Sequence, residues 1–595
     1  MPLLIAQGLA LHKQGKFNEA KAIYEKVLTI QANTFDALNL LGVLSAQTKQ
    51  FTKAVDFLTK ALQINLNHAD AYYNHGLSLQ ELKRLDEALT SYDRAISIKP
   101  DYAEAYCNRG SALQELKRLD EALTNYDRAI SIKPDFANAF CNRGDALNEL
   151  NRFDEALSSC DRAISIEPDF AEAHSNRGNA LRELKRLDEA LTSYDRAISI
   201  KPDYAKAHSN RGNALKELKR LDEALTSYDK AISIQPDYAE AHSNRGLALV
   251  ELNRLDEALT SYDRAISIKP DFPDAHWNLS LCNLLDGNYK DGWKGYEWRW
   301  MTKSMTVGIG NFSQPLWLGK ESLADKTILL YDEQGLGDTI QFCRYVSLVT
   351  AICAKVILRV QRPLVKLLMD LECVSNIIST GDVLPAFDYH CPLMSLPLAF
   401  KTELHSIPTP NAYLYADKAK ICSWQDRIGD IHGLKIGVVW NGGFRPNEPK
   451  LWGVNEIRNI PLKLFAEGLS SLNINFFSLQ KGDPAESEIR NCEKDYWPLG
   501  NFFNFADELK DFSDTAALIA NMDVVVSVDT STAHLSAALG KPTWILNRYD
   551  TCWRWLLGRD DSPWYESVKL YRQGEDRQWV PVLERVARDL LRLSQ

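Results

Sequence analysis

Two short segments in the second half of the chain combine residue types that could act on a polar substrate. In EQGLGDTIQFCRYV, Gly335 and Gly337 precede Asp338 at the expected start of a helix. A glycine-rich turn lets the backbone approach a ligand closely, and a carboxylate placed there could accept a proton. Aspartate is also a good helix N-cap, so a purely capping role for Asp338 is the alternative. The segment is not the dinucleotide-binding fingerprint, because its third glycine is missing.

The second segment is DFSDTAALIANMDVVVSVDTSTAHLSAALGKPTWIL, which predicts a helix, a buried strand, a polar turn and another helix. Asp529 ends the strand, and Thr530, Ser531 and His534 fall in the turn and the first turns of the helix. Backbone N–H groups at a helix N-terminus bind anions without a metal ion. A capping box alone would not require His534, so this segment predicts an anion site.

Further polar residues stand at the expected ends of other elements. Arg458 lies in EIRNIP just before a helix, Gln480 and Lys481 lie in SLQKG at a strand end, and Asn441 follows another strand. Arginine and lysine that converge on a helix N-terminus suit a diphosphate. The sequence has no Walker loop and no Asp-x-Asp after a strand, so we expect neither a metal ion nor another cofactor.

Alternating apolar runs and helical stretches from about residue 325 predict parallel sheets that position these residues. The candidate strands are 326–333, 355–361, 434–440, 473–480, 523–529 and 542–547, and the segment 405–417 is expected to connect two sheets. We therefore expect two doubly wound lobes with a cleft between them. Ligands bind at the carboxyl ends of the strands in such lobes.

The first half of the chain is an internal repeat with a period of 34 residues. Alanine and proline series begin at Ala20 and Pro100, and the glycines of the series are Gly8, Gly42, Gly76, Gly110, Gly144, Gly178, Gly212 and Gly246. This pattern is typical of tetratricopeptide repeats, in which helix pairs stack into a superhelix. It predicts an all-α solenoid of about eight and a half repeats over residues 1–300. All 14 tryptophans lie at or after Trp277, so we expect the aromatic last repeat to pack on the α/β half of the chain.

Two polar series run through the repeats. An amide can donate to a peptide carbonyl and accept from its N–H, so an asparagine ladder could hold an extended polypeptide. Asparagine is also common at this position of such repeats, which is the alternative interpretation. A second series, Arg109, Arg143, Arg177, Arg211 and Arg245, stands where the repeat usually has leucine and either covers the helix interface or favours an acidic acceptor. The asparagines are Asn74, Asn108, Asn142, Asn176, Asn210, Asn244 and Asn278.

Composition excludes several classes of protein. The net charge of −10 argues against a nucleic-acid-binding protein. The 11 cysteines form no Cys-x-x-Cys pair and no zinc-type spacing, which favours a reducing compartment. The N-terminus lacks the basic region of a signal peptide, and no run reaches the ~20 apolar residues of a membrane span. We therefore expect a cytoplasmic protein.

The motifs LGDT (336–339), RNIP (458–461) and SVDTSTAHLSAALGKP (527–542) resemble those of the ADP-heptose:lipopolysaccharide heptosyltransferases, glycosyltransferase family 9 with the GT-B fold. The resemblance implies that Asp338 is the general base and that Arg458, where the family often has lysine, contacts the donor phosphates. It implies an acceptor-side lobe over 301–420 and a nucleotide-sugar-binding lobe over 430–595. The residues assigned to the donor are Gly335, Gly337, Asn441, Arg458, Gln480, Lys481, Asp529, Thr530, Ser531 and His534.

The combination with repeats resembles the repeat-bearing O-GlcNAc transferases and flagellin glycosyltransferases. It implies an inverting, metal-independent enzyme that moves a sugar from a nucleotide sugar to a protein hydroxyl held by the repeat groove, with a flagellin-like protein among the candidate acceptors. The segment FDYHCPLMSLP (387–397) departs from the heptosyltransferases, so the acceptor stays open and His390 is a candidate acceptor contact.

Two alternatives remain at this point. One is a transferase for a lipid-linked or polysaccharide acceptor, whose repeats recruit partners or form an oligomer. The other is a non-catalytic repeat scaffold. The donor also stays open among ADP-heptose, UDP-N-acetylhexosamine, GDP-sugars and CMP-nonulosonates.

Overall fold

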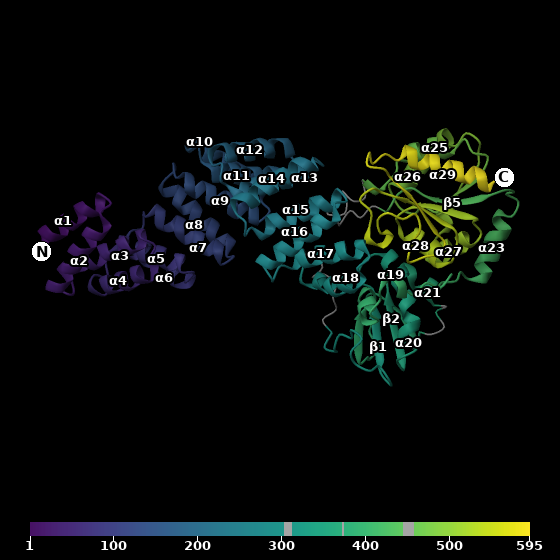
Figure 1. Ribbon diagram of the computed structural model, residues 1–595, viewed down its shortest axis with the longest axis horizontal. Helices are drawn as coiled ribbons and strands as arrows, with labels where there is room; N and C mark the ends of the chain where they lie inside the picture. The colour runs from purple at the N-terminus through teal and green to yellow at the C-terminus, as the bar shows by residue number, and fades with distance from the viewer. Residues whose placement is uncertain (303–311, 370, 372–373, 444–456) are drawn as a thin grey trace. The chain divides into compact units, whose positions relative to one another are not determined.

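The computed structural model describes residues 1–302, 312–369, 371, 374–443 and 457–595 (Figure 1). The chain forms two compact units, Met1–Ala248 and Leu249–Gln595. Each unit has its own architecture: the first is purely helical, and the second contains both parallel sheets.

The first unit is an array of antiparallel helix pairs, as the 34-residue period predicts. A Cβ on Gly178 would lie 2.5 Å from Cε1 of Tyr194, so only glycine lets the two helices of this repeat approach so closely. The same contact recurs between Gly76 and Tyr92. The helices are α1 (Pro2–Lys13), α2 (Phe17–Ile30), α3 (Phe35–Gln47), α4 (Phe51–Ile64), α5 (Ala69–Glu81), α6 (Leu85–Ile98), α7 (Ala103–Glu115), α8 (Leu119–Ile132), α9 (Ala137–Glu149), α10 (Phe153–Ile166), α11 (Ala171–Glu183), α12 (Leu187–Ile200), α13 (Ala205–Glu217) and α14 (Leu221–Ile234), with α15 (Ala239–Glu251) running into the second unit.

The second unit begins with helices of the repeat type and continues into two parallel sheets. The helices are α16 (Leu255–Ile268), α17 (Pro273–Asp286), α18 (Tyr289–Tyr296) and the 3-10 helix η1 (Glu297–Met301). These residues, which the sequence assigns to the repeat domain, therefore belong to the same compact unit as the sheets.

The smaller sheet has the strand order β3-β2-β1-β4, and all its pairings are parallel. It consists of β1 (Thr327–Tyr331), β2 (Lys355–Val360), β3 (Asn376–Ser379) and β4 (Tyr389–Pro392), with the helices α19 (Leu336–Phe342), α20 (Val346–Thr350), α21 (Val365–Leu368) and α22 (Leu396–Ala399).

The larger sheet has the order β10-β9-β8-β5-β6-β7 and is also parallel throughout. It consists of β5 (Lys435–Val439), β6 (Asn475–Ser478), β7 (Phe502–Asn504), β8 (Val524–Val528), β9 (Thr543–Asn547) and β10 (Val568–Arg572). Its helices are α23 (Lys418–Ile428), α25 (Leu462–Leu469), α26 (Ala485–Tyr496), α27 (Phe512–Ala520), α28 (Ser531–Ala538) and α29 (Val580–Leu593). The two parallel sheets confirm the predicted two-lobed α/β architecture of the GT-B type.

The aromatic last repeat packs on the lobes, as its composition predicts. The ring of Trp293 lies 5.3 Å from that of Trp553 and 5.9 Å from that of Phe342. The indole N–H of Trp564 donates to the Tyr289 hydroxyl at 3.0 Å. These side chains belong to one buried core that includes residues of both sheets, so the last repeat and the lobes fold around shared apolar surface.

Candidate functional site

The first predicted motif forms the turn between β1 and α19. Gly335 is the N-cap of α19, and its backbone N–H donates to Oδ2 of Asp338 at 2.8 Å. Asp338 therefore does cap its own helix. Its side chain is 19% exposed, so the capping carboxylate still reaches the surface of the lobe.

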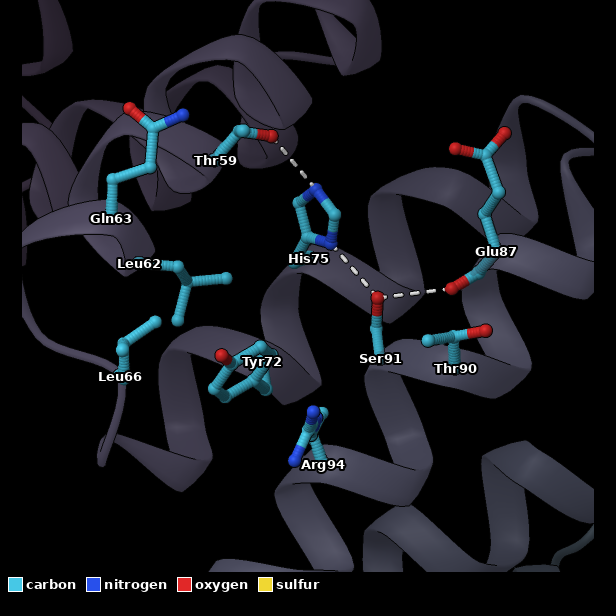
Figure 2. A pocket seen from close by; sticks show the side chains of 10 residues that line it. All are labelled: Thr59, Leu62, Gln63, Leu66, Tyr72, His75, Glu87, Thr90, Ser91 and Arg94. Atoms are coloured by element: carbon cyan, nitrogen blue, oxygen red, sulfur yellow. Dashed lines mark hydrogen bonds between the residues drawn. The ribbon is translucent and has the colours of Figure 1, made fainter.

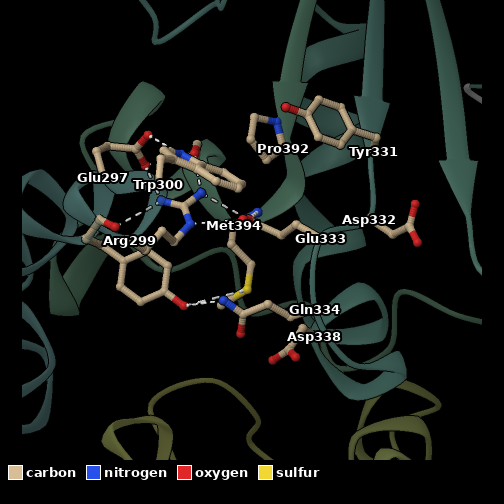
Figure 3. Close-up of polar contacts among 12 residues, drawn as sticks. Glu297, Arg299, Trp300, Tyr331, Asp332, Glu333, Gln334, Asp338, Pro392 and Met394 are labelled. Atoms are coloured by element: carbon tan, nitrogen blue, oxygen red, sulfur yellow. Dashed lines mark hydrogen bonds and ion pairs between the residues drawn. The ribbon is translucent and has the colours of Figure 1, made fainter. Parts of the chain in front are cut away.

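A buried ionic cluster fixes the residues just before that turn (Figure 3). Arg299 of η1 is fully buried, and its guanidinium pairs with the Glu333 carboxylate at 2.9 Å and with Glu297 at 2.7 Å. Burial raises the pKa of Glu333, and Arg299 opposes that rise. Gln334 donates to the Tyr296 hydroxyl at 2.9 Å. The last repeat thus holds the end of β1, which sets the position of the Asp338 turn.

The second predicted motif forms the turn between β8 and α28. Thr530 is the N-cap, and its hydroxyl accepts from the N–H of Ala533 at 3.4 Å. The helix begins at Ser531, so its free N–H groups lie beside Asp529. Burial raises the pKa of the Asp529 carboxyl, whereas His534, Arg458, Trp555 and Arg554 together lower it, so the net pKa lies below the usual range.

His534 is buried and does not project freely into solvent. Its Nδ1 lies 2.9 Å from the Tyr565 hydroxyl, its Nε2 lies 3.7 Å from Oδ1 of Asp529, and its ring stacks on Trp555. Burial lowers the pKa of His534 to about 4. The ring is therefore neutral at pH 7, and it lies against the Asp529 turn.

The two motifs meet where α19 and α28 begin. A Cβ on Gly337 would lie 3.0 Å from Cδ2 of His534 and 3.4 Å from Cα of Ser531. A side chain at this position would require its neighbours to shift, so Gly337 favours the close approach of α19 to α28. The structure therefore brings Asp338 of one lobe beside the Asp529–His534 turn of the other.

Arg458 joins this site from a third segment. Its Nη1 donates to the backbone carbonyl of Asp529 at 2.9 Å. The guanidinium lies against Gly442, where a Cβ would stand 2.0 Å from Nη2. Gly442 is thus required for Arg458 to reach the end of β8.

The other residues predicted to contact the donor, Asn441, Gln480 and Lys481, differ in how their side chains are engaged. The Gln480 side chain pairs with both backbone groups of Asn441, at 2.9 and 3.1 Å, which ties the ends of β5 and β6 together. Oδ1 of Asn441 is buried and, among the described residues, accepts no hydrogen bond. Lys481 donates to the Ala506 carbonyl at 2.6 Å and pairs with Glu486, which directs its ammonium toward β7 and α26. Asn441 is thus better placed for a ligand than Gln480 or Lys481.

Sequence reasoning missed Arg554, which lies in the 3-10 helix η8 (Trp553–Trp555) after β9. Its guanidinium pairs with Oδ1 of Asp338, donates to Gln341 at 2.8 Å and stacks on Trp553. Burial alone would lower the pKa of Arg554, but the Asp338 carboxylate raises it, so the charge is kept. The available signal was an arginine between two tryptophans, following a strand whose carboxyl end faces a predicted ligand site.

His390, the candidate acceptor contact, lies in β4 and is buried. Its Nδ1 is 3.3 Å from the Tyr331 hydroxyl, and its ring packs at 4.9 Å on Phe312. Burial lowers the pKa of His390. These contacts place His390 within the smaller lobe, away from the Asp338 turn.

The asparagine series makes contacts between neighbouring repeats. The amide N–H groups of Asn108 and Asn210 donate to Tyr73 and Asn179 of the preceding repeat, at 2.8 and 2.9 Å. Asn142 and Asn176 make the corresponding contacts to Ser111 and Cys141, while Asn74, Asn244 and Asn278 are half-buried. Four amides of the series therefore already bridge repeats through their N–H groups.

The arginine series is neutralised by aspartates. Each arginine donates from Nε to an aspartate of the preceding repeat at 2.6–2.7 Å, in the pairs Arg109–Asp93, Arg143–Asp127, Arg177–Asp161, Arg211–Asp195 and Arg245–Asp229. The arginines thus connect successive second helices, and their charge is balanced within the array.

The repeat before this series lacks the pair and has a pocket (Figure 2). His75 stands in place of the arginine and Thr59 in place of the aspartate, and the ring bridges Thr59 and Ser91 at 3.0 and 2.9 Å. The pocket has a volume of about 380 Å³ and is lined also by Leu62 and Tyr72. Burial lowers the pKa of His75.

Neither a metal-binding cluster nor a membrane-spanning helix occurs in the parts of the chain that the structure describes. No three His, Cys, Asp or Glu side chains gather there in a way that could hold a metal ion. Within the same residues, no helix is both long and apolar enough to cross a bilayer.

Sequence comparison decides the family. Residues 477–556, which contain β8, the Asp529 turn, α28 and Arg554, match glycosyltransferase family 9 (heptosyltransferase). The chain carries a family 9 glycosyltransferase domain. Tetratricopeptide repeat families match 78–117, 110–150, 137–170, 178–219, 212–252 and 246–284, and residues 13–95 match anaphase-promoting complex, cyclosome, subunit 3.

Relatives of the chain include the protein FlbA of Caulobacter vibrioides, 26% identical over 325 residues. The match covers 51% of this chain and 52% of FlbA, so the chain spans about half the length of this relative. Among solved structures, MamA is 28% identical over 28% of this chain and 96% of its own, with a TM-score of 0.27. YrrB, described as a TPR protein with an unusual peptide-binding site, is 26% identical over 31% of this chain and 95% of its own, with a TM-score of 0.25.

Proposed function

We propose that the enzyme transfers a sugar from a nucleoside diphosphate sugar to a hydroxyl of a protein, with inversion and without a metal ion. The observation that carries this proposal is the meeting of α19 and α28. It sets a carboxylate, Asp338, opposite a helix N-terminus that can bind an anion, and Gly337 makes the approach possible.

The transfer requires one proton acceptor and one stabilised leaving group. Asp338 takes the proton of the acceptor hydroxyl, and the oxygen attacks the anomeric carbon from the face opposite the diphosphate. The bond from that carbon to the phosphate oxygen breaks, and its electron pair leaves with the nucleoside diphosphate. Asp338 then releases the proton to solvent. Positioned general-base catalysis contributes about 10²–10⁴-fold to the rate.

The leaving diphosphate needs positive charge. The N–H groups at the start of α28 and the Arg458 guanidinium supply it at the end of β8. Because these groups are fixed by the fold before the donor arrives, they need little reorganisation during the reaction. The buried Oδ1 of Asn441 adds one acceptor for a ligand N–H or hydroxyl.

The acceptor proposal rests on the repeat array. Four of the amide N–H groups already bridge repeats, so a polypeptide backbone would bind these asparagines through their carbonyl oxygens. A transferase for glycan acceptors would use the same donor site. Incubation with a radiolabelled donor separates the two, since label on protein supports the proposal and label only on glycan contradicts its acceptor.

Asp338→Asn tests the base. Nucleotide release is measured with ADP-heptose, UDP-N-acetylglucosamine, GDP-mannose and a CMP-nonulosonate, and the donor that supports turnover is then used for all variants. We expect Asp338→Asn to lower turnover about 10²–10⁴-fold without loss of donor affinity. Asp332→Asn is the matched control, because Asp332 also follows β1 but pairs with Arg359 and Thr380. Turnover of Asp338→Asn at the level of the wild type would contradict the assignment.

A further inference from the structure

Each oxygen of the carboxylate proposed as the base has one partner in the structure. Oδ2 of Asp338 accepts the Gly335 N–H at 2.8 Å, and Oδ1 is paired with Arg554. Arg554 occupies one side of Oδ1 and so competes with an acceptor hydroxyl that would approach the same oxygen.

Arg554 lies where a donor diphosphate would compete for it. The arginine comes from the larger lobe, and its partner Asp338 comes from the smaller one. The next residue of η8, Trp555, stacks on His534 with the ring centroids 5.3 Å apart, which places η8 beside the start of α28. The side chain is only 12% exposed and stacks on Trp553, which limits its hydration and favours an anionic partner.

Charge balance gives the direction of the change. A nucleoside diphosphate sugar carries two negative charges on its diphosphate, which attract both Arg458 and Arg554, while the Asp529 carboxylate offsets part of the positive charge of the two arginines. Without a donor, the Arg554 charge is balanced by Asp338. When the diphosphate takes Arg554, Asp338 becomes an unpaired carboxylate that can accept a proton. The third charge that develops on the leaving nucleoside diphosphate strengthens the same contact in the transition state.

We infer that Arg554 is a donor-binding residue that exchanges the Asp338 carboxylate for the donor diphosphate, so that donor binding releases the base. This inference rests on the proposed function. It makes donor binding precede productive acceptor binding. It also explains why the arginine and the carboxylate belong to different lobes, since each lobe then contributes one member of a pair that must separate.

A different arginine–aspartate pair provides the matched control. Arg359 is also 12% exposed and pairs with Asp332 at 3.2 Å. Both residues lie at the ends of neighbouring strands of the smaller lobe, and Asp332 also holds the Thr380 hydroxyl. Arg359→Gln therefore removes a comparable buried pair that has no contact with α28.

The affinities of ADP, UDP and GDP, their monophosphates and inorganic pyrophosphate are measured by calorimetry on the full chain. We expect Arg554→Gln to weaken binding of the preferred diphosphate by about 10–100-fold, as for loss of a charge-assisted hydrogen bond. Binding of the monophosphate should change less. Arg554→Lys should restore part of the affinity, and Arg359→Gln should bind like the wild type.

Asp338→Asn tests the exchange itself. Removal of the competing carboxylate should tighten diphosphate binding several-fold, and adding Arg554→Gln should abolish that gain. Thermal unfolding shows that each variant is folded, and Arg554→Lys keeps the test valid if the glutamine variant is not. Diphosphate affinities that stay unchanged in Arg554→Gln and Asp338→Asn would overturn the exchange and leave the proposed function standing. A wild type that binds none of the nucleotides would instead overturn the proposed function.

Discussion

The charged pairs of the repeat array differ in burial and in number from those of the second unit, Leu249–Gln595. The five repeated pairs leave their arginines 23–26% exposed and their aspartates 52–59% exposed. In the second unit, the side chains of Arg299 and Glu333 are 0% and 4% exposed. Partly solvated pairs contribute about 0–1 kcal/mol, whereas loss of one partner of a buried pair costs about 3–5 kcal/mol.

The pairs of the repeat array are redundant, whereas each buried pair of the second unit occurs once. The array repeats one pair five times, and it already contains a natural break at His75, in the repeat before the series, where the helices still stack (Figure 2). In the second unit, Arg299 holds the end of β1 before the turn that carries Asp338, and Arg554 pairs with Asp338 itself. No equivalent pair stands beside either arginine, so we expect their substitution to lower stability or activity without compensation.

The largest effect is expected from Arg299→Met. The methionine fills much of the volume but leaves Glu333 buried without its cation, so the second unit should lose about 3–5 kcal/mol of unfolding free energy. All 14 tryptophans lie at or after Trp277, so urea unfolding followed by tryptophan fluorescence reports on this unit alone. Arg592→Met, at an exposed pair with Asp589, is the control and should cost less than about 1 kcal/mol. Equal losses in the two variants would contradict the comparison.

A smaller effect is expected from acidification through His534. Its folded-state pKa of about 4 lies below the ordinary value of 6.5, so the unfolded chain takes up the proton first. The stability that the neutral ring provides is complete above pH 6.5 and is lost as the pH falls from 6.5 to 4, by roughly 3 kcal/mol in all. Asp529, whose pKa is lowered, loses its contribution only below its ordinary value of 3.8.

The measurement is the urea stability of the second unit between about pH 7 and about pH 4.5, followed by tryptophan fluorescence. His534→Gln should flatten most of the slope, and the buried His390, whose pKa is also lowered, should leave a remainder. His405→Gln, at an exposed position, should leave the slope intact. A His534→Gln profile as steep as that of the wild type would show that His534 does not cause the acid sensitivity.

The sequence predicted the interior of both sheets and missed their edges. The six strands it identified, such as β1 and β8, are all flanked by neighbours on both sides and read as continuous apolar runs. The four it missed are β3, β4, β7 and β10, and each is an edge strand of its sheet. The apolar pattern of these strands is weak, because β7 has only three residues and β10 has exposed or half-buried positions among its five.

The sequence likewise predicted the parts of the site that neighbouring residues encode and missed a contact between residues that are distant in the chain. Asp338 and the Asp529–His534 turn stand in short motifs, because a helix start and its glycines are encoded by adjacent residues. Arg554 is 216 residues from Asp338 in the chain, and nothing near it in sequence indicates that partner. Lys481 shows the converse, since a strand-end lysine suggested a phosphate contact but the fold bonds it to the Ala506 carbonyl.

The smallest effect is expected where the array's natural break is copied into its middle. Asp161→Thr with Arg177→His reproduces Thr59 and His75, and Ser193 stands where Ser91 lies in the original. The ion pair is replaced by two hydrogen bonds from the imidazole, so local stability should fall by less than about 1 kcal/mol.

Hydrogen exchange of peptides from α10 to α12 measures that local stability, because each repeat contacts mainly its neighbours. Arg177→His alone is the informative partner variant. It leaves Asp161 more than half exposed and hydrated, so it should cost no more than the double variant plus a few tenths of a kcal/mol. A loss of about 3 kcal/mol in the double variant would place the repeated pairs in the same class as Arg299 and remove the distinction between the two regions.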